Sequence, residues 1–235
     1  MLNQIVQAWR HVFKLDPDRP IDDQTLEAVC SSGTDAIMVG GSSGVTYDNT
    51  NSLLGQIRKF QIPCVLEVSA LEAIVPGFDL FLIPMVLNSS DPQWLIGNQA
   101  QAAEMYGEMI PWDTLVPEGY IVLNPDSTVA MRTEANTSLT DSEAAAYAQI
   151  ADRMFQLPIV YVEYSGTFGD MELVSAVGRR LEHSRLFYGG GIVDGETARL
   201  AASACDTIVV GNIIYSDLNK ALETVAVIKN SSIQI

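Results

Sequence analysis

The chain has 235 residues, of which 48% are hydrophobic, and its 13 Lys and Arg against 29 Asp and Glu give a net charge of −16. Such an acidic chain is unsuited to nucleic acid, because a phosphate backbone is bound by clustered Lys and Arg, or to steady attachment to an anionic membrane. The length suits one α/β barrel of about 250 residues, so we expect a single domain over residues 1–235.

Short β-rich runs alternate with longer helix-like stretches along the chain. The expected strands are residues 11–15, 36–39, 64–68, 80–83, 120–123, 159–163, 186–188 and 207–210. The expected helices are residues 24–31, 51–60, 94–109, 141–155, 171–182, 196–204 and 216–229. This order is typical of an open doubly wound sheet or of a closed barrel. The presence of eight expected strands favours the (β/α)8 TIM barrel.

One interval does not fit this repeat. Only residues 69–79 separate the third and fourth expected strands, and they contain Pro76-Gly77. That is too short for a crossover helix with two loops. We therefore expect a modified barrel with a short or missing third helix.

The first expected strand ends in Lys14-Leu15-Asp16, and barrel enzymes place their active sites at the C-terminal ends of strands. Lys14 and Asp16 are two residues apart and therefore point to the same side of the strand, while His11 belongs to the other, outer side. Inward charges are costly to bury without a task or a partner. Phosphate contact by Lys14 with metal ligation by Asp16, and a simple Lys–Asp pair, both fit this pattern.

A glycine-rich segment, Gly40-Gly41-Ser42-Ser43-Gly44, follows the second expected strand. Glycines at a strand exit allow backbone N–H groups to approach an anion closely. The hydroxyl of Ser42 could join a Mg2+ site, because Mg2+ prefers hard oxygen ligands. A flexible loop without a ligand is the alternative.

Glu163 stands near the end of the sixth expected strand, within Tyr161-Val162-Glu163-Tyr164-Ser165-Gly166. By alternation it shares one face with Tyr161. A carboxylate in an otherwise apolar strand suits a general base, or it is a buried Glu satisfied by a neighbouring strand. The Ser-Gly pair directly after the strand favours the functional interpretation.

The seventh and eighth expected strands both run into glycine, in Gly189-Gly190-Gly191 and Gly211-Asn212. Loops after strands seven and eight form the phosphate site of many barrels. The occurrence of both motifs favours backbone phosphate binding over two tight turns.

Other signatures are missing from the sequence. No G-x-G-x-x-G follows a strand and no G-x-x-x-x-G-K-[ST] occurs, so hydride transfer and nucleotide hydrolysis have little support. The three widely spaced cysteines suit reduced core thiols, and neither His11 nor His183 looks catalytic. Residues 1–10 do not resemble a signal peptide, and no run approaches the ~18 apolar residues of a transmembrane helix. We therefore expect a cytoplasmic protein.

Six segments together carry a family resemblance. They are residues 11–17 (HVFKLDP), 40–42 (GGS), 65–84 (VLEVSALEAIVPGFDLFLIP), 161–166 (YVEYSG), 188–192 (YGGGI) and 209–212 (VVGN). The set resembles the bacterial PcrB proteins, which are heptaprenylglyceryl phosphate synthases and relatives of the archaeal geranylgeranylglyceryl phosphate synthases. The resemblance runs over nearly the whole chain. It implies a modified barrel with an atypical third unit, and a homodimer.

The resemblance also implies a Mg2+-dependent prenyltransferase that moves a heptaprenyl (C35) group from heptaprenyl diphosphate to the sn-3 hydroxyl of sn-glycerol 1-phosphate. Lys14 and Glu163 would be the catalytic pair: Lys14 would contact glycerol 1-phosphate, and Glu163 would bind its hydroxyls and deprotonate the attacking one. Asp16 and Ser42 would hold Mg2+ against the prenyl diphosphate. The glycerol 1-phosphate cradle would consist of Lys14, Tyr161, Val162, Glu163, Tyr164, Ser165, Gly166, Gly191, Gly211 and Asn212.

The length of the donor depends on the expected helix over residues 94–109. In the family, a small residue near Ala102 goes with the longer, heptaprenyl donor, because a bulky residue would plug the prenyl groove. Alanines are also simply good helix formers. A synthase of the geranylgeranyl type with a C20 donor is therefore one alternative, and a non-catalytic barrel that binds a phosphorylated metabolite is another.

Overall fold

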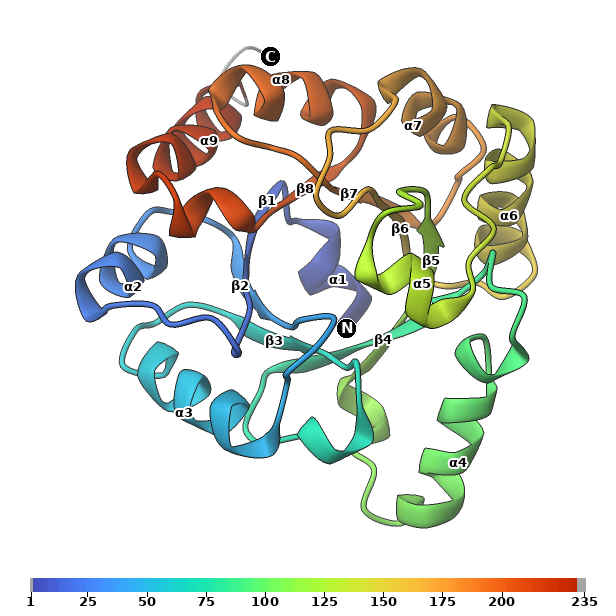
Figure 1. Ribbon diagram of the computed structural model, residues 1–235, viewed down its shortest axis with the longest axis horizontal. Coiled ribbons are helices and arrows are strands. Elements are labelled where there is room, and N and C mark those ends of the chain that lie inside the picture. The colour runs from blue at the N-terminus through green and yellow to red at the C-terminus, as the bar shows by residue number, and fades with distance from the viewer. Residues whose placement is uncertain (1, 232–235) are drawn as a thin grey trace.

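A computed structural model, which describes residues 2–231, shows a closed barrel of eight parallel strands in the order β1 to β8 (Figure 1). The strands are β1 His11–Leu15, β2 Ala36–Val39, β3 Cys64–Glu67, β4 Leu80–Val86, β5 Leu115–Val122, β6 Ile159–Glu163, β7 Arg185–Gly189 and β8 Thr207–Val210. Each strand pairs in parallel with the next, and β8 pairs with β1. The predicted TIM barrel is confirmed.

Helices surround the strands, and α4 extends away from the barrel beyond the other helices (Figure 1). The α-helices are α1 Leu2–Gln7, α2 Asp23–Cys30, α3 Tyr47–Ile57, α4 Gly97–Tyr106, α5 Thr128–Thr133, α6 Asp141–Arg153, α7 Met171–Gly178, α8 Gly195–Ala204 and α9 Leu218–Ser231. The 3-10 helices are η1 Leu71–Ala73, η2 Pro92–Trp94, η3 Trp112–Thr114 and η4 Asn212–Tyr215. No helix within residues 2–231 combines the length and apolar character needed to span a bilayer.

The third unit of the barrel is reduced as the sequence predicts, because β3 and β4 are joined only by the three-residue η1. The helix expected over residues 94–109 is wrong in its extent, since it divides into η2 and the separate helix α4. The fifth strand begins at Leu115 rather than at residue 120. Pro117 and Gly119 conceal its first half in the sequence, because both residue types are depleted in strands. The short helices α1 and α5 were not predicted.

The hydrophobic core forms two layers. Inside the barrel, Val12, Met38, Val65, Leu82 and Phe187 pack together. The alternate strand residues face outward and pack against the helices. This alternation confirms that Lys14 shares the inner face of β1, since Val12 two residues before it lies in the inner cluster.

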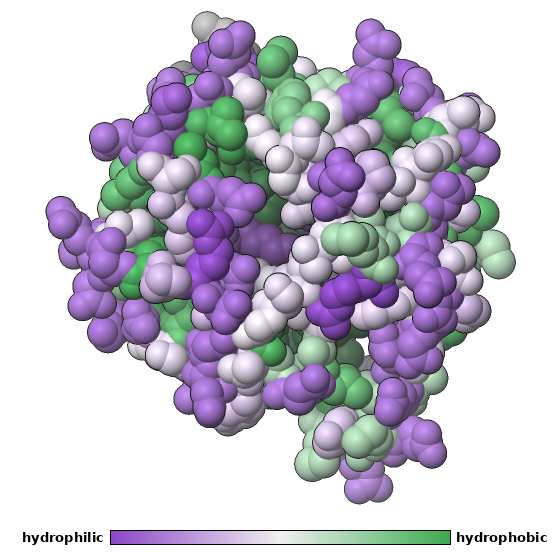
Figure 2. All heavy atoms as spheres, in the orientation of Figure 1, coloured by the Kyte–Doolittle hydropathy of each residue, from purple (hydrophilic) through white to green (hydrophobic). Residues whose placement is uncertain are grey.

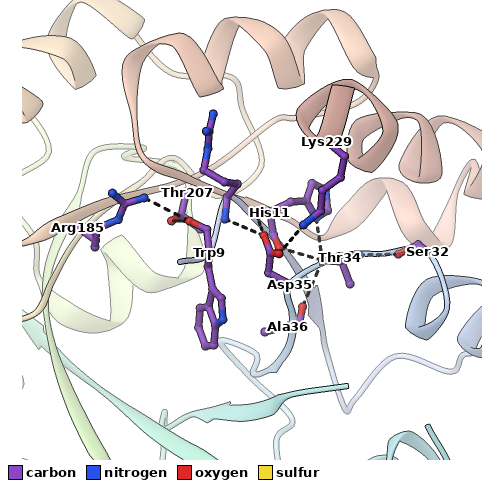
Figure 3. Close-up of polar contacts among 10 residues, drawn as sticks. Trp9, His11, Ser32, Thr34, Asp35, Ala36, Arg185, Thr207 and Lys229 are labelled. Carbon is purple, nitrogen blue, oxygen red and sulfur yellow. Dashed lines mark hydrogen bonds and ion pairs between the residues drawn. The ribbon is translucent and has the colours of Figure 1, made fainter. Parts of the chain in front are cut away.

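A network of polar contacts surrounds the start of β1 (Figure 3). The imidazole of His11 lies fully buried, with its two nitrogens each 2.9 Å from a hydroxyl, those of Thr34 and Thr224. Asp35 accepts hydrogen bonds from the backbone of residues 10 and 11 and pairs with Lys229 at 2.5 Å. Burial lowers the pKa of His11 to about 3. His11 is therefore a structural residue on the outer face, as the sequence predicts.

Candidate active site

The C-terminal ends of the strands surround one large cavity of about 1490 Å3. Figure 2 shows hydrophilic residues around a hollow in this face of the molecule, with hydrophobic residues among hydrophilic ones on the lobe over α4. Most of the predicted site residues line it together: Lys14, Asp16, Ser42, Ala102, Tyr161, Glu163, Ser165, Gly166, Gly191, Gly211 and Asn212.

Two residues of the predicted cradle point elsewhere. Val162 lies in the outer core, because it alternates with the inward Tyr161 and Glu163 along β6. Tyr164 packs against Tyr188, with ring centroids 6.3 Å apart. The side chains of Val162 and Tyr164 therefore do not line the cavity.

Lys14 forms a short ion pair inside the barrel with Glu67, a residue that sequence reasoning did not place in the site. Its Nζ atom lies 2.5 Å from Oε2 of Glu67, at the end of β3. Burial lowers the pKa of Lys14, but the negative charges of Glu67 and Glu163 outweigh it and raise that pKa above its usual value. Lys14 is therefore a cation at the cavity floor, and its partner is Glu67 rather than Asp16.

Glu163 is held by a tyrosine from the neighbouring strand. The hydroxyl of Tyr120 donates to Oε2 of Glu163 at 2.7 Å and lies 3.4 Å from Oε1 of Glu67. Burial raises the pKa of Glu163, although the charge of Lys14 and the bond from Tyr120 act against it. A carboxylate with a raised pKa, fixed at a cavity wall, can accept a proton from a bound hydroxyl.

Glu118 is a second buried carboxyl group that sequence reasoning missed. It lies on β5 two residues before Tyr120, and neither of its oxygens has a hydrogen-bond partner within the described part of the chain. Burial, followed by the charge of Glu67, raises the pKa of Glu118 well above its ordinary value. This environment therefore favours the protonated form of Glu118. Its alternation with Tyr120 could have revealed it, had β5 been predicted to begin earlier.

Asp16 and Ser42 lie at the mouth of the cavity, where β1 and β2 end side by side. The amide of Gly40 donates to the carbonyl of Leu15 at 3.0 Å, which joins the two exits. A Cβ atom at Gly41 would lie 2.6 Å from Oδ1 of Asp16, so a larger residue there would displace the carboxylate.

Asp16 and Ser42 suit a Mg2+ ion whose coordination shell is completed by substrate phosphates. The Asp16 carboxylate lines the cavity and forms no ion pair with any Lys or Arg in the described chain. Mg2+ is commonly bound by one or two carboxylates together with substrate phosphates and waters. The donor set at Asp16 and Ser42, one carboxylate and one hydroxyl, matches that pattern.

The glycine loops after β7 and β8 form a glycine wall, which lies on the other side of β1 from β2. Gly190 and Gly191 have φ angles of 147° and 56°, and a Cβ atom at Gly191 would lie 2.1 Å from the amide nitrogen of Phe168. Within residues 2–231, the amide groups of Gly190, Gly191, Gly211 and Asn212 donate to no other residue. Such free amides at the ends of β7 and β8 suit an anion.

The remaining part of the cavity is an apolar groove beside η1 and α4. Its lining includes Leu71, Ile74, Phe81, Ile83, Trp94 and Trp112. Ala102 lines this groove from α4. The site therefore joins a charged, amide-lined end to a long apolar one.

The chain matches the model of the PcrB family over residues 3–229. It belongs to the PcrB family. This PcrB protein is 50% identical over 224 residues to the heptaprenylglyceryl phosphate synthase of Geobacillus kaustophilus, and the match covers 95% of this chain and 94% of the relative. It is 51% identical over 224 residues to that of Bacillus cereus, covering 95% of this chain and 98% of the relative.

A solved structure shares the fold of this PcrB protein closely. The (S)-3-O-geranylgeranylglyceryl phosphate synthase of Thermoplasma acidophilum, crystallised in complex with its substrate sn-glycerol-1-phosphate, superposes with a TM-score of 0.85 at 25% identity. The match covers 97% of this chain and 96% of the other. The PcrB family and this synthase therefore share one barrel architecture.

Proposed function

We propose that this PcrB protein is a heptaprenylglyceryl phosphate synthase. It transfers the heptaprenyl group of heptaprenyl diphosphate to the sn-3 hydroxyl of sn-glycerol 1-phosphate. The observation that carries the proposal is the composite cavity, in which an ionic end with free backbone amides continues into an apolar groove. Its volume of about 1490 Å3 exceeds the roughly 300–1,000 Å3 of ordinary ligand pockets, as a long lipid tail requires.

In this proposal the phosphate of the acceptor occupies the glycine wall. The free amides of Gly191, Gly211 and Asn212, together with the cation of Lys14, would bind it. Fixing the phosphate holds the attached glycerol in one orientation, which supplies the entropic part of the rate enhancement. Asn212 is itself oriented, because its side-chain oxygen accepts a hydrogen bond from Arg19 at 2.8 Å.

The proton of the attacking hydroxyl passes to Glu163. As the allylic C–O bond of the donor breaks, the acceptor oxygen forms the new ether bond and diphosphate leaves. Tyr120 holds the accepting carboxylate by its 2.7 Å hydrogen bond. Asp16 and Ser42 would hold Mg2+, which supplies charge neutralisation to the diphosphate leaving group.

Other parts of the proposal rest on the sequence and the family alone. These are the homodimer and the cytoplasmic location. The C35 rather than C20 donor is also proposed. Ala102 supports the longer donor, since its small side chain lines the apolar groove and leaves it open.

The test incubates the purified protein with Mg2+, labelled glycerol 1-phosphate and prenyl diphosphates of increasing length, with glycerol 3-phosphate as control. We expect a lipid-extractable product from glycerol 1-phosphate only, with heptaprenyl diphosphate as the best donor. Glu163→Gln should lower kcat by about 100- to 10,000-fold, and Asp16→Ala should abolish the response to Mg2+. Lack of product with every donor would refute the proposal and favour a non-catalytic barrel.

A further inference from the structure

Two cations line the cavity within the described residues, Lys14 and Arg132. Lys14 is already paired with Glu67. Arg132 forms no ion pair with any carboxylate in the described chain. The cavity thus has one guanidinium group whose charge is not matched by a neighbouring carboxylate.

Arg132 belongs to α5 and reaches across the cavity mouth. Its Nη1 atom donates to the backbone carbonyl of Ser42, and its guanidinium carbon lies 5.7 Å from the ring centroid of Trp94. A guanidinium has five N–H donors in a planar fork that matches phosphate oxygens. Most of these donors are unused, because the contact with Ser42 is the only hydrogen bond that Arg132 donates within residues 2–231.

The position of this guanidinium marks a boundary in the cavity. On one side lies Ser42, beside the carboxylate of Asp16, and on the other side lies Trp94 in the apolar groove. A prenyl diphosphate that extends its tail along the groove and its anionic head toward Asp16 must pass this point. The part of the donor that lies beside the guanidinium is then its diphosphate.

The charges of the cavity wall favour such a cation. Four carboxylates, Asp16, Glu67, Glu72 and Glu163, line the cavity against the two cations. Two anionic substrates would be repelled by this wall unless cations face each of them. Lys14, deep in the barrel, pairs with Glu67. Arg132 is therefore the cationic side chain at the cavity mouth that can face the donor, beside the Mg2+ proposed at Asp16 and Ser42.

We propose that Arg132 binds the diphosphate of the prenyl donor, exchanging its contact with the neutral Ser42 carbonyl for anionic oxygens. This inference rests on the proposed function and adds a residue that recognises the leaving group. Charge builds up on the diphosphate as the C–O bond breaks, so the contact strengthens toward the transition state. Arg132 therefore contributes to kcat as well as to donor binding.

Steady-state kinetics of Arg132→Gln, Arg132→Lys and the matched surface control Arg199→Ala test this role. Gln keeps an N–H donor for the Ser42 carbonyl but removes the charge. We expect R132Q to raise KM for the prenyl donor and the inhibition constant of inorganic pyrophosphate by about 10- to 100-fold, as for a lost charge-assisted hydrogen bond. KM for glycerol 1-phosphate should stay within about twofold of the wild-type value. R132K keeps a point charge but loses the planar fork of donors, so its donor KM and pyrophosphate inhibition constant should lie between those of the wild type and R132Q.

Calorimetry of Mg2+ and inorganic pyrophosphate with each folded variant separates this inference from the proposed function. If the wild-type protein forms product but R132Q retains wild-type donor KM and pyrophosphate inhibition, Arg132 only joins α5 to the loop after β2 and the inference is wrong. If the wild-type protein forms no product from any donor, the proposed function fails. In that case, a loss of pyrophosphate binding in R132Q alone would still establish the anion site, and equal binding in all variants would refute it.

Discussion

Tyr120 on β5 and Glu163 on β6 are joined across neighbouring strands by a hydrogen bond of 2.7 Å, which the phenol donates. The ring of Tyr120 stacks on that of Tyr161, with centroids 4.6 Å apart and an interplanar angle of 12°. Burial raises the pKa of Tyr120 well above its ordinary value, so the phenol remains a donor. The stack fixes the hydroxyl, and the hydroxyl fixes the carboxylate.

Tyr120→Phe should therefore lower kcat while leaving KM for the prenyl donor nearly unchanged. The loss should be about 10-fold, the value of one hydrogen bond to a charged group. The bond from Tyr120 lowers the pKa of Glu163, so its removal should move the acidic limb of the kcat–pH profile to higher pH. Tyr147→Phe, on α6, is the control. An unshifted kcat–pH profile would show that Glu163 is not the proton acceptor.

Gly191→Ala should weaken glycerol 1-phosphate binding. The added methyl group would lie 2.1 Å from the amide nitrogen of Phe168, so the glycine wall must move. Gly33→Ala is the matched control, because Gly33 also has a positive φ, 89°, but has open space around its Cβ position. We expect KM for glycerol 1-phosphate to rise at least about 10-fold in the first variant only, as for a lost charge-assisted contact. Equal effects in both would point to backbone strain instead.

Glu118→Gln should stabilise the protein increasingly as the pH rises. The pKa of Glu118 is raised on folding, so the folded protein keeps a proton that the unfolded chain releases above its ordinary pKa of 4.5. The wild-type protein therefore loses stability from pH 4.5 upward, and Gln removes that loss. Urea unfolding at pH 4.5 and pH 8 measures it. A difference between variants that does not grow with pH would show that Glu118 is ionised when folded.

The buried His11 should make the protein sensitive to mild acid. Its pKa is about 3 in the folded state against 6.5 when unfolded, so the unfolded chain takes up a proton first as the pH falls. Stability present above pH 6.5 should be lost toward pH 3, by about 2 kcal/mol at pH 5. His11→Gln should flatten this dependence in unfolding measurements, and His183→Gln should not. If His11→Gln left the pH dependence of stability unchanged, His11 would not be its source.

Ala102→Tyr should shift the donor preference to shorter prenyl chains. The side chain of residue 102 lines the apolar groove, and a phenol there would block the path of the distal isoprene units. Competition between C20 and C35 diphosphates measures the ratio of kcat/KM. We expect a change of about 10-fold or more in favour of the C20 donor, as for several methylene groups excluded from a pocket. Ala103→Tyr, which does not line the cavity, is the control.

The barrel was predictable because its strands are apolar and several of the loops that follow them are rich in glycine. β1, β2, β6 and β8 have the bounds that the sequence indicates. The residues at strand ends were predictable for the same reason, since a known strand end fixes where Lys14 and Glu163 point and places Ser42 in the loop just beyond β2.

The missed residues are those whose setting depends on tertiary pairing. Glu118 follows Pro117 in a segment that resembles a turn, yet β5 pairs there with both neighbours. Glu67 ends a strand of only four residues, too short for alternation to reveal its inward side chain. Arg132 lies on α5, a helix of six residues without a sequence period of its own. Its approach to Ser42 joins positions 90 residues apart, which no local pattern encodes.

The reduced third unit has a consequence for how the core is completed. Where a full barrel would cover β3 and β4 with a helix, this protein has η1, and Leu71, Ile74 and Phe81 face the groove. On the proposed function, the hydrocarbon tail of the donor lies against these side chains and takes the place of the absent helix. The lipid is then both a substrate and a temporary part of the hydrophobic core. In each catalytic cycle, these side chains are covered when the donor binds and exposed again when the product leaves.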